Sequence, residues 1–188
     1  MKKLLLILIY FPIIFSCGEK EDDKKENNIY LSIGDTYQGG IIFYLDGNSG
    51  GLIAAPTDQS TEAQWGCYET LIPGANGTGI GTGNQNTIDI ENRCTTSLTA
   101  AEICTKLTIG GFNDWFLPSK DELNEMYLNI GEGNTLGLKN IGGFADTFYW
   151  SSSEFDNNAT AWTQSFGNGY QYGSSKDFNY NVRAVRAF

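Results

Sequence analysis

The sequence predicts an α+β domain with two short helices, an early β-hairpin and a group of C-terminal strands. Two segments, 99–107 and 120–129, place apolar residues three and four positions apart, the spacing of a helix that buries one face. Apolar runs at 37–46 and 51–56 have the content and alternation of strands. The 23 glycines indicate many turns and short elements rather than long helices.

The N-terminus reads as a lipoprotein signal peptide over residues 1–16. Lys2 and Lys3 supply the basic start, and the apolar stretch that follows is too short for a comfortable transmembrane span. It ends in Ile-Phe-Ser-Cys, which resembles a bacterial lipobox, where a small residue precedes the lipidated cysteine. Cys17 is therefore predicted to be the lipidated first residue of the mature chain. An ordinary signal peptide with a chance cysteine is the alternative.

Residues 17–28 are predicted to form a lipidated acidic tether. After the cysteine, the run GEKEDDKKENN has no apolar side chain with which to pack. Its acidic cluster, Glu19 with residues 21–23, resembles the surface-export signal of Bacteroidota lipoproteins, and a plain spacer is the alternative. We therefore expect a lipid-anchored protein of the outer membrane, exposed at the cell surface, with its folded domain over residues 29–188.

Charge restricts the partners of that domain. The chain has a net charge of −10, and residues 1–28 sum to zero, so the whole negative charge falls on residues 29–188. Such a domain should repel nucleic acid, anionic lipid headgroups and sulfated glycans at long range. No nucleic-acid partner is expected, and the membrane is expected to be contacted through the lipid anchor.

The folded domain is predicted to begin with the β-hairpin. Its two runs, 37–46 and 51–56, are joined by Gly-Asn-Ser-Gly, which favours a tight turn. Alternation puts apolar residues on both sides of the first strand, with Ile41, Phe43 and Leu45 on one side and Ile42 and Tyr44 on the other. We therefore expect this strand in the middle of the domain.

Residues 58–92 are predicted to be long and irregular, with five glycines between Gly74 and Gly83. A loop of this length in a compact domain is either functional or held by cross-links. The glycines do not form a phosphate-binding loop, because no Lys-Ser or Lys-Thr pair follows them and the strand–helix context is missing.

Both predicted helices have capping residues at their starts. Thr99 can cap the first helix, with Glu102 three residues later, and Ser119 can cap the second, with Glu122 in the capping-box position. Just before the second helix, the apolar run Trp-Phe-Leu at 115–117 has strand character and is stopped by a proline.

The C-terminal part is predicted to form strands within 148–154, 159–169 and 181–188. The last of these puts Arg183 and Arg186 on opposite sides of the sheet. At most one of the two should therefore be buried, and that one would need a carboxylate partner.

Several stretches, taken in order, resemble the Lcl C-terminal domain family: GGIIFYLD…GGLIAAP, QWGC, NDWFLPSKDEL, FYWSSSE and the terminal VRAVRAF. The resemblance implies a C-type-lectin-like fold, in which two helices pack on a curled antiparallel sheet with long loops on one side. It also implies that a strand of the early hairpin meets the C-terminal strand. Fold alone does not determine function.

The chain has no histidine, which excludes a Ser-His-Asp triad, a histidine-bearing zinc site and imidazole acid–base catalysis. It also lacks the Glu-Pro-Asn or Gln-Pro-Asp motif with which true C-type lectins hold calcium and sugar, and its Asn113-Asp114-Trp115 has an altered order. We therefore expect a protein that is not an enzyme, with neither a cofactor nor a metal site.

With Cys17 lipidated, three cysteines remain in an oxidising compartment. Cys104 lies on the apolar stripe of the first helix and is predicted to be a buried thiol. A disulfide between Cys67 and Cys94 is then expected to clip the glycine-rich loop. A Cys94–Cys104 bond is the alternative.

Candidate ligand contacts fall in the C-terminal half. One group is an oxygen-rich loop without EF-hand spacing, made up of Glu154, Asp156, Asn157 and Asn158. A solvated turn is the simpler interpretation of that loop. Tyr170 and Tyr172 belong to a stretch that mixes aromatic with small polar residues, a composition that suits recognition of a glycan or a protein.

Together these observations predict a non-enzymatic cell-surface lipoprotein that binds an extracellular glycan or protein through loops of a lectin-like domain. The prediction rests on the lipobox, the tether, the family resemblance and the absent catalytic groups. A structural module of a cell-envelope complex, with no small ligand, is the alternative.

Overall fold

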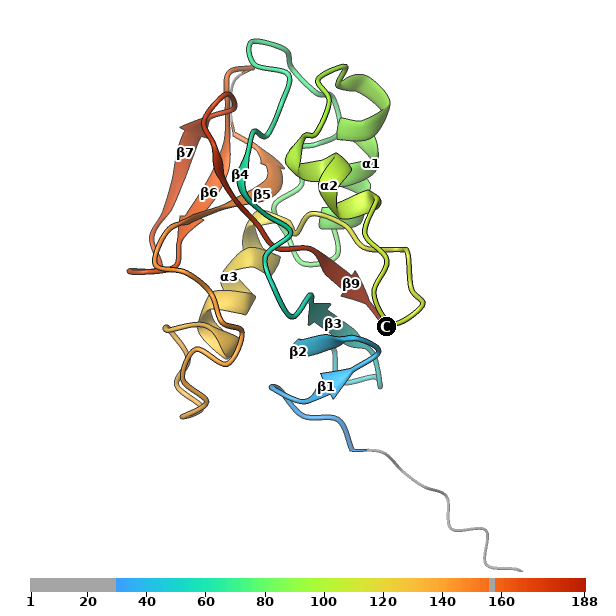
Figure 1. The fold of residues 1–188 in the computed structure, drawn as a ribbon, viewed down its shortest axis with the longest axis vertical. Helices are drawn as coiled ribbons and strands as arrows, with labels where there is room; N and C mark the ends of the chain where they lie inside the picture. Colours follow the sequence, from blue (N-terminus) through green and yellow to red (C-terminus); the bar gives the residue numbers. More distant parts are fainter. Residues whose placement is uncertain (1–29, 156–157) are drawn as a thin grey trace, which may run out of the picture. The chain divides into compact units, whose positions relative to one another are not determined.

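Two β-sheets and three α-helices form the domain over Leu31–Phe188 in a computed structural model that describes residues 30–155 and 158–188 (Figure 1). The predicted signal peptide and the predicted tether with its lipidated Cys17 lie outside the described residues, and so do Asp156 and Asn157. The observed fold class is α+β, as expected.

The smaller sheet joins the beginning of the domain to its end. Its strands are β1 (Thr36–Tyr37), β2 (Gly40–Leu45), β3 (Gly51–Ala54) and β9 (Val185–Ala187), in the order β1-β2-β3-β9. Every neighbouring pair is antiparallel. The predicted hairpin is therefore confirmed as β2 and β3, and β3 meets the C-terminal strand, as the family resemblance implied.

Both sides of β2 are covered by other residues, but its side chains do not simply alternate between the two sides. The register shifts between Ile42 and Tyr44, and such a bulge re-aims the side chains that follow it. Tyr44 consequently packs in the same cluster as Phe43, and Leu45 packs in the same cluster as Ile42. Burial on both sides is confirmed, while the predicted sides of Tyr44 and Leu45 are exchanged.

The larger sheet has five strands in the order β4-β8-β5-β6-β7. They are β4 (Ser60–Ala63), β5 (Phe148–Glu154), β6 (Thr160–Ser165), β7 (Gln171–Ser175) and β8 (Tyr180–Val182). β5 and β8 run parallel, and the other neighbours are antiparallel. The domain therefore has two sheets, one of them mixed, where a single curled antiparallel sheet was expected.

The predicted terminal strand 181–188 is divided between the two sheets. Its first residues end β8 in the larger sheet, and its last residues form β9 in the smaller sheet. Arg183 and Ala184 make the crossing between them. The C-terminal segment therefore ties the sheets together, which alternation within one strand does not predict.

Both arginines of this segment are buried, so the expectation of at most one is wrong. Arg183 is 1% exposed, its Nη2 lies 2.6 Å from Asp58 Oδ1, and its Nη1 donates to two backbone carbonyls. Arg186 is 8% exposed and pairs with Asp114. Different layers cover the two sides of the segment, and each arginine has the carboxylate that burial of a charge requires.

Three helices, rather than two, lie in the described residues. α2 (Ala100–Thr105) and α3 (Lys120–Ile130) match the predicted helices and have the predicted caps. α1 (Gly83–Arg93) occupies the end of the region for which the sequence predicts irregular structure. Its buried residues are Gly83, Asn86, Thr87 and Ile90. Only one of these is large and apolar, so α1 lacks the stripe by which a helix is recognised.

No helix among the described residues is long and apolar enough to span a bilayer.

The core has two clusters, on the two sides of the smaller sheet. The run 115–117 shows the division, since Trp115 and Leu117 belong to one cluster and Phe116 to the other. Residues 115–117 form one isolated β-bridge, between Phe116 and Val185, where a short strand was expected.

Candidate functional site

The predicted ligand contacts that the structure describes do not lie at one place. Glu154 is the last residue of β5, and Asn158 follows the two residues that are not described. Tyr170 precedes β7 and Tyr172 lies within it. Asn158 is exposed, and its Nδ2 donates to the carbonyl of Glu69 at 2.9 Å.

Strand register decides which side of the larger sheet each residue occupies. In β6 and β7, Tyr172 lies opposite Thr163, and Gly173 lies opposite Trp162. Consecutive residues of a strand point to opposite sides, so Tyr172 and Trp162 lie on different sides of the sheet. The aromatic residues of the C-terminal half therefore do not form one surface.

One side of the sheet carries a chain of five aromatic rings, here called the aromatic strip. Ring centroids are 6.4, 5.9, 5.2 and 6.2 Å apart along the series Tyr170, Tyr172, Phe148, Tyr180 and Phe178. Three of these four contacts are edge-to-face, a geometry that ring quadrupoles favour. Tyr170, Tyr172 and Phe178 are 66%, 43% and 53% exposed, so the strip faces solvent.

The aromatic strip is attached to the core. Tyr180 contacts the fully buried Trp150, with 5.0 Å between ring centroids. Phe148 is the member that sequence reasoning missed. It lies on β5 and reaches Tyr172 of β7, although β6 separates these strands in the sheet. The sequence offers one signal for Phe148, because it is an aromatic residue at the start of a predicted strand, where side chains alternate between the two sides.

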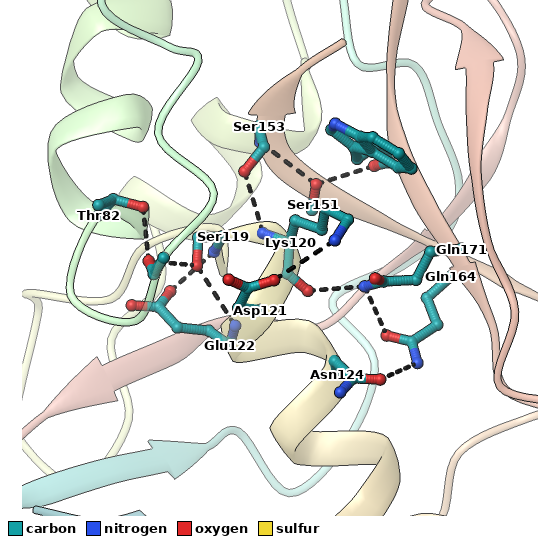
Figure 2. A network of polar contacts seen from close by, with 12 residues as sticks. Thr82, Ser119, Lys120, Asp121, Glu122, Asn124, Ser151, Ser153, Gln164 and Gln171 are labelled. Atoms are coloured by element: carbon teal, nitrogen blue, oxygen red, sulfur yellow. Dashed lines mark hydrogen bonds and ion pairs between the residues drawn. The ribbon is translucent and has the colours of Figure 1, made fainter.

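The other side of β6 and β7 is polar and covered by α3. Figure 2 shows Gln164 and Gln171 near the start of α3, where Gln164 Nε2 donates to Asn124 Oδ1 at 2.9 Å. Gln171 Nε2 donates to the carbonyl of Lys120 at 2.8 Å. The Nζ of Lys120 lies 4.9 Å from the ring centroid of Trp162. These contacts hold the start of the helix against the two strands.

α3 begins with the predicted capping box, and its glutamate also holds a loop. Ser119 Oγ accepts from Glu122 N, and Glu122 Oε2 accepts from Ser119 N (Figure 2). The other oxygen, Oε1, accepts from Gly81 N at 2.8 Å. The side chain is buried, and this desolvation raises the pKa of Glu122, against the lowering effect of its hydrogen bonds.

The glycine-rich loop, residues 71–83, is hydrogen-bonded to several neighbouring elements. The carbonyl of Gly77 accepts from Ser153 Oγ and from Asn86 Nδ2, both at 2.6 Å. The carbonyl of Thr78 accepts from the first turn of α3 at 2.9 Å. The loop is therefore an ordered wall between α1, α3 and β5, despite its glycine content.

Glu154 is buried in an ion pair, so the interpretation as a solvated turn is wrong at this residue. Its carboxylate binds Lys176 Nζ and accepts from Ile72 N. Lys176 Nζ also donates to the carbonyl of Thr70 at 2.8 Å and lies 4.5 Å from the Trp65 ring centroid. Desolvation lowers the pKa of Lys176, against the raising effect of its carboxylate partner. The role of Glu154 as a ligand contact stays a prediction.

A cleft lies between the glycine-rich loop and a wall made of Glu154, Phe155 and Trp162. It consists of cavities of about 210 and 400 Å³ that share Asn76, Glu154 and Phe155. Trp162 lines the larger cavity, and its ring centroid lies 4.5 Å from that of Phe155 in an edge-to-face contact. None of the five rings of the aromatic strip lines either cavity. The strip and the cleft are therefore separate candidate sites.

The predicted disulfide between Cys67 and Cys94 is present, and the two cysteines are 27 positions apart. It attaches the chain before the glycine-rich loop to the C-terminal cap of α1. Cys104 is a free and buried thiol on α2, and burial raises its pKa. The alternative Cys94–Cys104 bond is therefore excluded.

A sequence model of the Lcl C-terminal domain family matches residues 55–186, a range that includes both the aromatic strip and the cleft. β1, β2 and β3 precede the matched range. No curated protein sequence matches the chain.

Proposed function

The chain belongs to the Lcl C-terminal domain family, and from this premise we propose that its domain is a non-enzymatic binding module with a C-type-lectin-like fold. A lipid-anchored protein carries the domain at the cell surface, where its C-terminal half binds an extracellular glycan or protein. Support for the fold comes from the hairpin that meets the C-terminal strand and from helices packed against the sheets.

The observation that carries this proposal is the aromatic strip. Exposed rings that contact one another across β5, β7 and β8 provide a large contact area on a hydrogen-bonded frame. Aromatic side chains lose little conformational entropy on binding, and Tyr adds a polar hydroxyl to an apolar ring. Contiguous apolar surface of this kind marks interaction sites on soluble domains.

The net charge of the domain restricts the kinds of ligand that it can bind. Residues 29–188 carry the whole net charge of −10, so a polyanionic ligand would be repelled at long range. A neutral glycan or a protein with a neutral or basic surface fits this field.

The test is a glycan array and a pull-down with the full chain and with Tyr170→Ala/Tyr172→Ala. We expect the wild type to retain a ligand that the double variant loses. Tyr68→Ala is the matched control, because Tyr68 is also an exposed tyrosine, at 46%, and lies outside the strip. Blank results for the wild type in both experiments would contradict the proposal.

A fixed structural role in an envelope complex is the second candidate. The same exposed rings favour it, because a permanent partner could cover them. Isolation of the protein from membranes distinguishes the two. Co-purification with one envelope protein at constant stoichiometry, lost in the Tyr170→Ala/Tyr172→Ala variant, supports assembly. Release of that envelope protein when a free ligand is added supports the binding-module proposal.

The anchor is tested separately. Cys17→Ser should release the protein from the membrane fraction, because each buried CH₂ of an acyl chain contributes about 0.8 kcal/mol of membrane affinity. Fractionation and incorporation of labelled fatty acid measure this. Label that still enters the Cys17→Ser variant would show that the lipobox interpretation is wrong.

A further inference from the structure

Trp162 differs from the other three tryptophans of the chain. Trp65, Trp115 and Trp150 are buried, and each donates its indole N–H to a backbone carbonyl at 2.9, 3.1 and 2.8 Å, respectively. Trp162 is only partly buried, and no hydrogen bond joins its indole N–H to a residue that the structure describes. An indole N–H is a donor that protein groups usually satisfy. The indole N–H of Trp162 has no such partner among the described residues, so a bound molecule can accept from it.

Two further polar side chains of the cleft are available. Asn76 lines both cavities and Thr78 lines the larger one. Both residues are exposed, and neither side chain is hydrogen-bonded to another described residue. An amide and a hydroxyl can each donate and accept. The backbone that presents them is held by the hydrogen bonds of Gly77 and Thr78, so the place from which each side chain extends is defined before a ligand binds.

The apolar wall of the cleft is also held in place. Phe155 contacts the ring of Trp162 edge to face, and Lys120 lies over the indole. A Cβ at Gly173 would lie 3.0 Å from Cδ1 of Phe155, so the glycine leaves the room that this ring occupies. A preorganised wall reduces the entropy lost on binding.

We propose that this cleft binds one neutral sugar ring of a glycan. A sugar ring has apolar C–H faces that can lie on aromatic rings, and its hydroxyls both donate and accept, as the free groups of the cleft do. The larger cavity, about 400 Å³, has the size usual for small-molecule sites. A charged acidic sugar is disfavoured by the net charge of −10. The proposal goes beyond the aromatic strip and does not depend on it.

The experiment titrates the full chain with methyl glycosides of neutral hexoses and N-acetylhexosamines. Saturation-transfer NMR measures the affinity, and tryptophan fluorescence reports the location. Because the other three tryptophans are buried, binding should change the emission of Trp162, and the change should vanish in Trp162→Phe. Asn76→Ala should weaken binding by about three- to tenfold, the range expected for one hydrogen bond.

Two variants keep the test specific. Asn84→Ala is the matched control, since Asn84 is an exposed asparagine of α1 that lines neither cavity, and it should bind as the wild type does. Thr78→Val removes the second polar group independently of Asn76 and should weaken binding by a similar factor. Circular dichroism and thermal unfolding confirm that each variant is folded.

Three results would overturn the proposal: no glycoside binding by the wild type, equal binding by the wild type and Asn76→Ala, or tighter binding of a uronic acid than of its neutral counterpart. Sugar binding that is lost in Tyr170→Ala/Tyr172→Ala but kept in Asn76→Ala would also overturn it, and would leave the proposed function of the aromatic strip intact. Binding lost in Asn76→Ala and Thr78→Val, but kept in the tyrosine variant, supports the cleft.

Discussion

The two sides of β6 and β7 differ in what surrounds them. On one side, Gln164 and Gln171 are hydrogen-bonded to α3, and Trp162 lies beside the cleft. On the other side, Tyr172 lies in a row of rings that faces solvent. The same two strands thus contribute to a polar, covered side and to an aromatic, open side.

This difference indicates which parts of the molecule determine stability and which determine binding. The enclosed groups of the domain are the glutamines under α3, the Glu154–Lys176 pair and the disulfide, and removal of one partner from any of them is destabilising. The open side depends on side chains whose removal exposes little. Substitutions of the enclosed groups should therefore change the free energy of unfolding, and those of the exposed rings should change ligand retention.

The largest effect is expected from Glu154→Ala. This substitution leaves Lys176 buried without its carboxylate, which should lower the free energy of unfolding by about 3–5 kcal/mol. Urea unfolding measures the loss. The double variant Glu154→Gln/Lys176→Met should be less destabilised than Glu154→Ala, because no unpaired charge remains. A loss below about 1 kcal/mol for Glu154→Ala would show that the pair contributes little to the stability of the fold.

Removal of the disulfide comes next. The bond closes a glycine-rich segment, and Cys67→Ser should lower the free energy of unfolding by about 3–4 kcal/mol in the chain-entropy model. Cys94→Ser should cost the same and the double variant no more, because each removes the same bond. Cys104→Ala should cost less. Denaturant unfolding with non-reducing peptide mapping checks this, and additive losses would contradict it.

Glu122→Gln should have an intermediate effect that depends on pH. A glutamine has one acceptor oxygen for the donors that the carboxylate now satisfies, so the loss at neutral pH should be about 1–3 kcal/mol. Burial raises the pKa of Glu122 above 4.5, so the folded chain binds this proton more readily than the unfolded chain does. As pH falls through the raised pKa, protonation stabilises the wild type but not the variant.

The gap in unfolding free energy between wild type and Glu122→Gln should therefore widen on acidification. Paired urea titrations at neutral and mildly acidic pH measure it, and effects of other carboxylates cancel in the difference. A gap that narrows as pH falls would show that the hydrogen bonds, rather than desolvation, dominate this site.

The smallest effect on stability is expected from Tyr170→Ala. The ring is 66% exposed, so the free energy of unfolding should change by no more than about 0.5 kcal/mol. Ligand retention by the aromatic strip should nevertheless fall. Thermal unfolding and the pull-down, run on the same samples, separate the two quantities. A large loss of stability would mean that the open side also supports the fold.

Features encoded by neighbouring residues were predictable. The caps of α2 and α3 were read correctly, because Thr99 and Ser119 each bond to a backbone N–H three residues later. The hairpin was read correctly, because its turn and its two strands are contiguous. The Cys67–Cys94 disulfide was predictable because Cys104 lies on the apolar stripe of a predicted helix. In the structure the Cys104 thiol is free and buried.

Features that depend on distant residues were missed. α1 has a buried face of Gly, Asn and Thr, whose partners are loop carbonyls and the hydroxyls of β5. The burial of Lys176 depends on Glu154, Thr70 and Trp65, which lie on three other segments. No local period marks such residues, because their polar groups are satisfied only after the chain has folded.

The fold class, two of the helices, the hairpin and the disulfide can be predicted from the sequence. The helix caps and the hairpin are set by residues close along the chain, whereas the disulfide joins residues 27 positions apart and follows from the place of Cys104 on an apolar helix stripe. Tertiary contacts alone place the C-terminal segment in two sheets, bury both of its arginines, and put Tyr172 and Trp162 on opposite sides of β6 and β7. These features depend on strand register, because a shift of one residue moves a side chain to the other side of a sheet and long-range pairing sets that register.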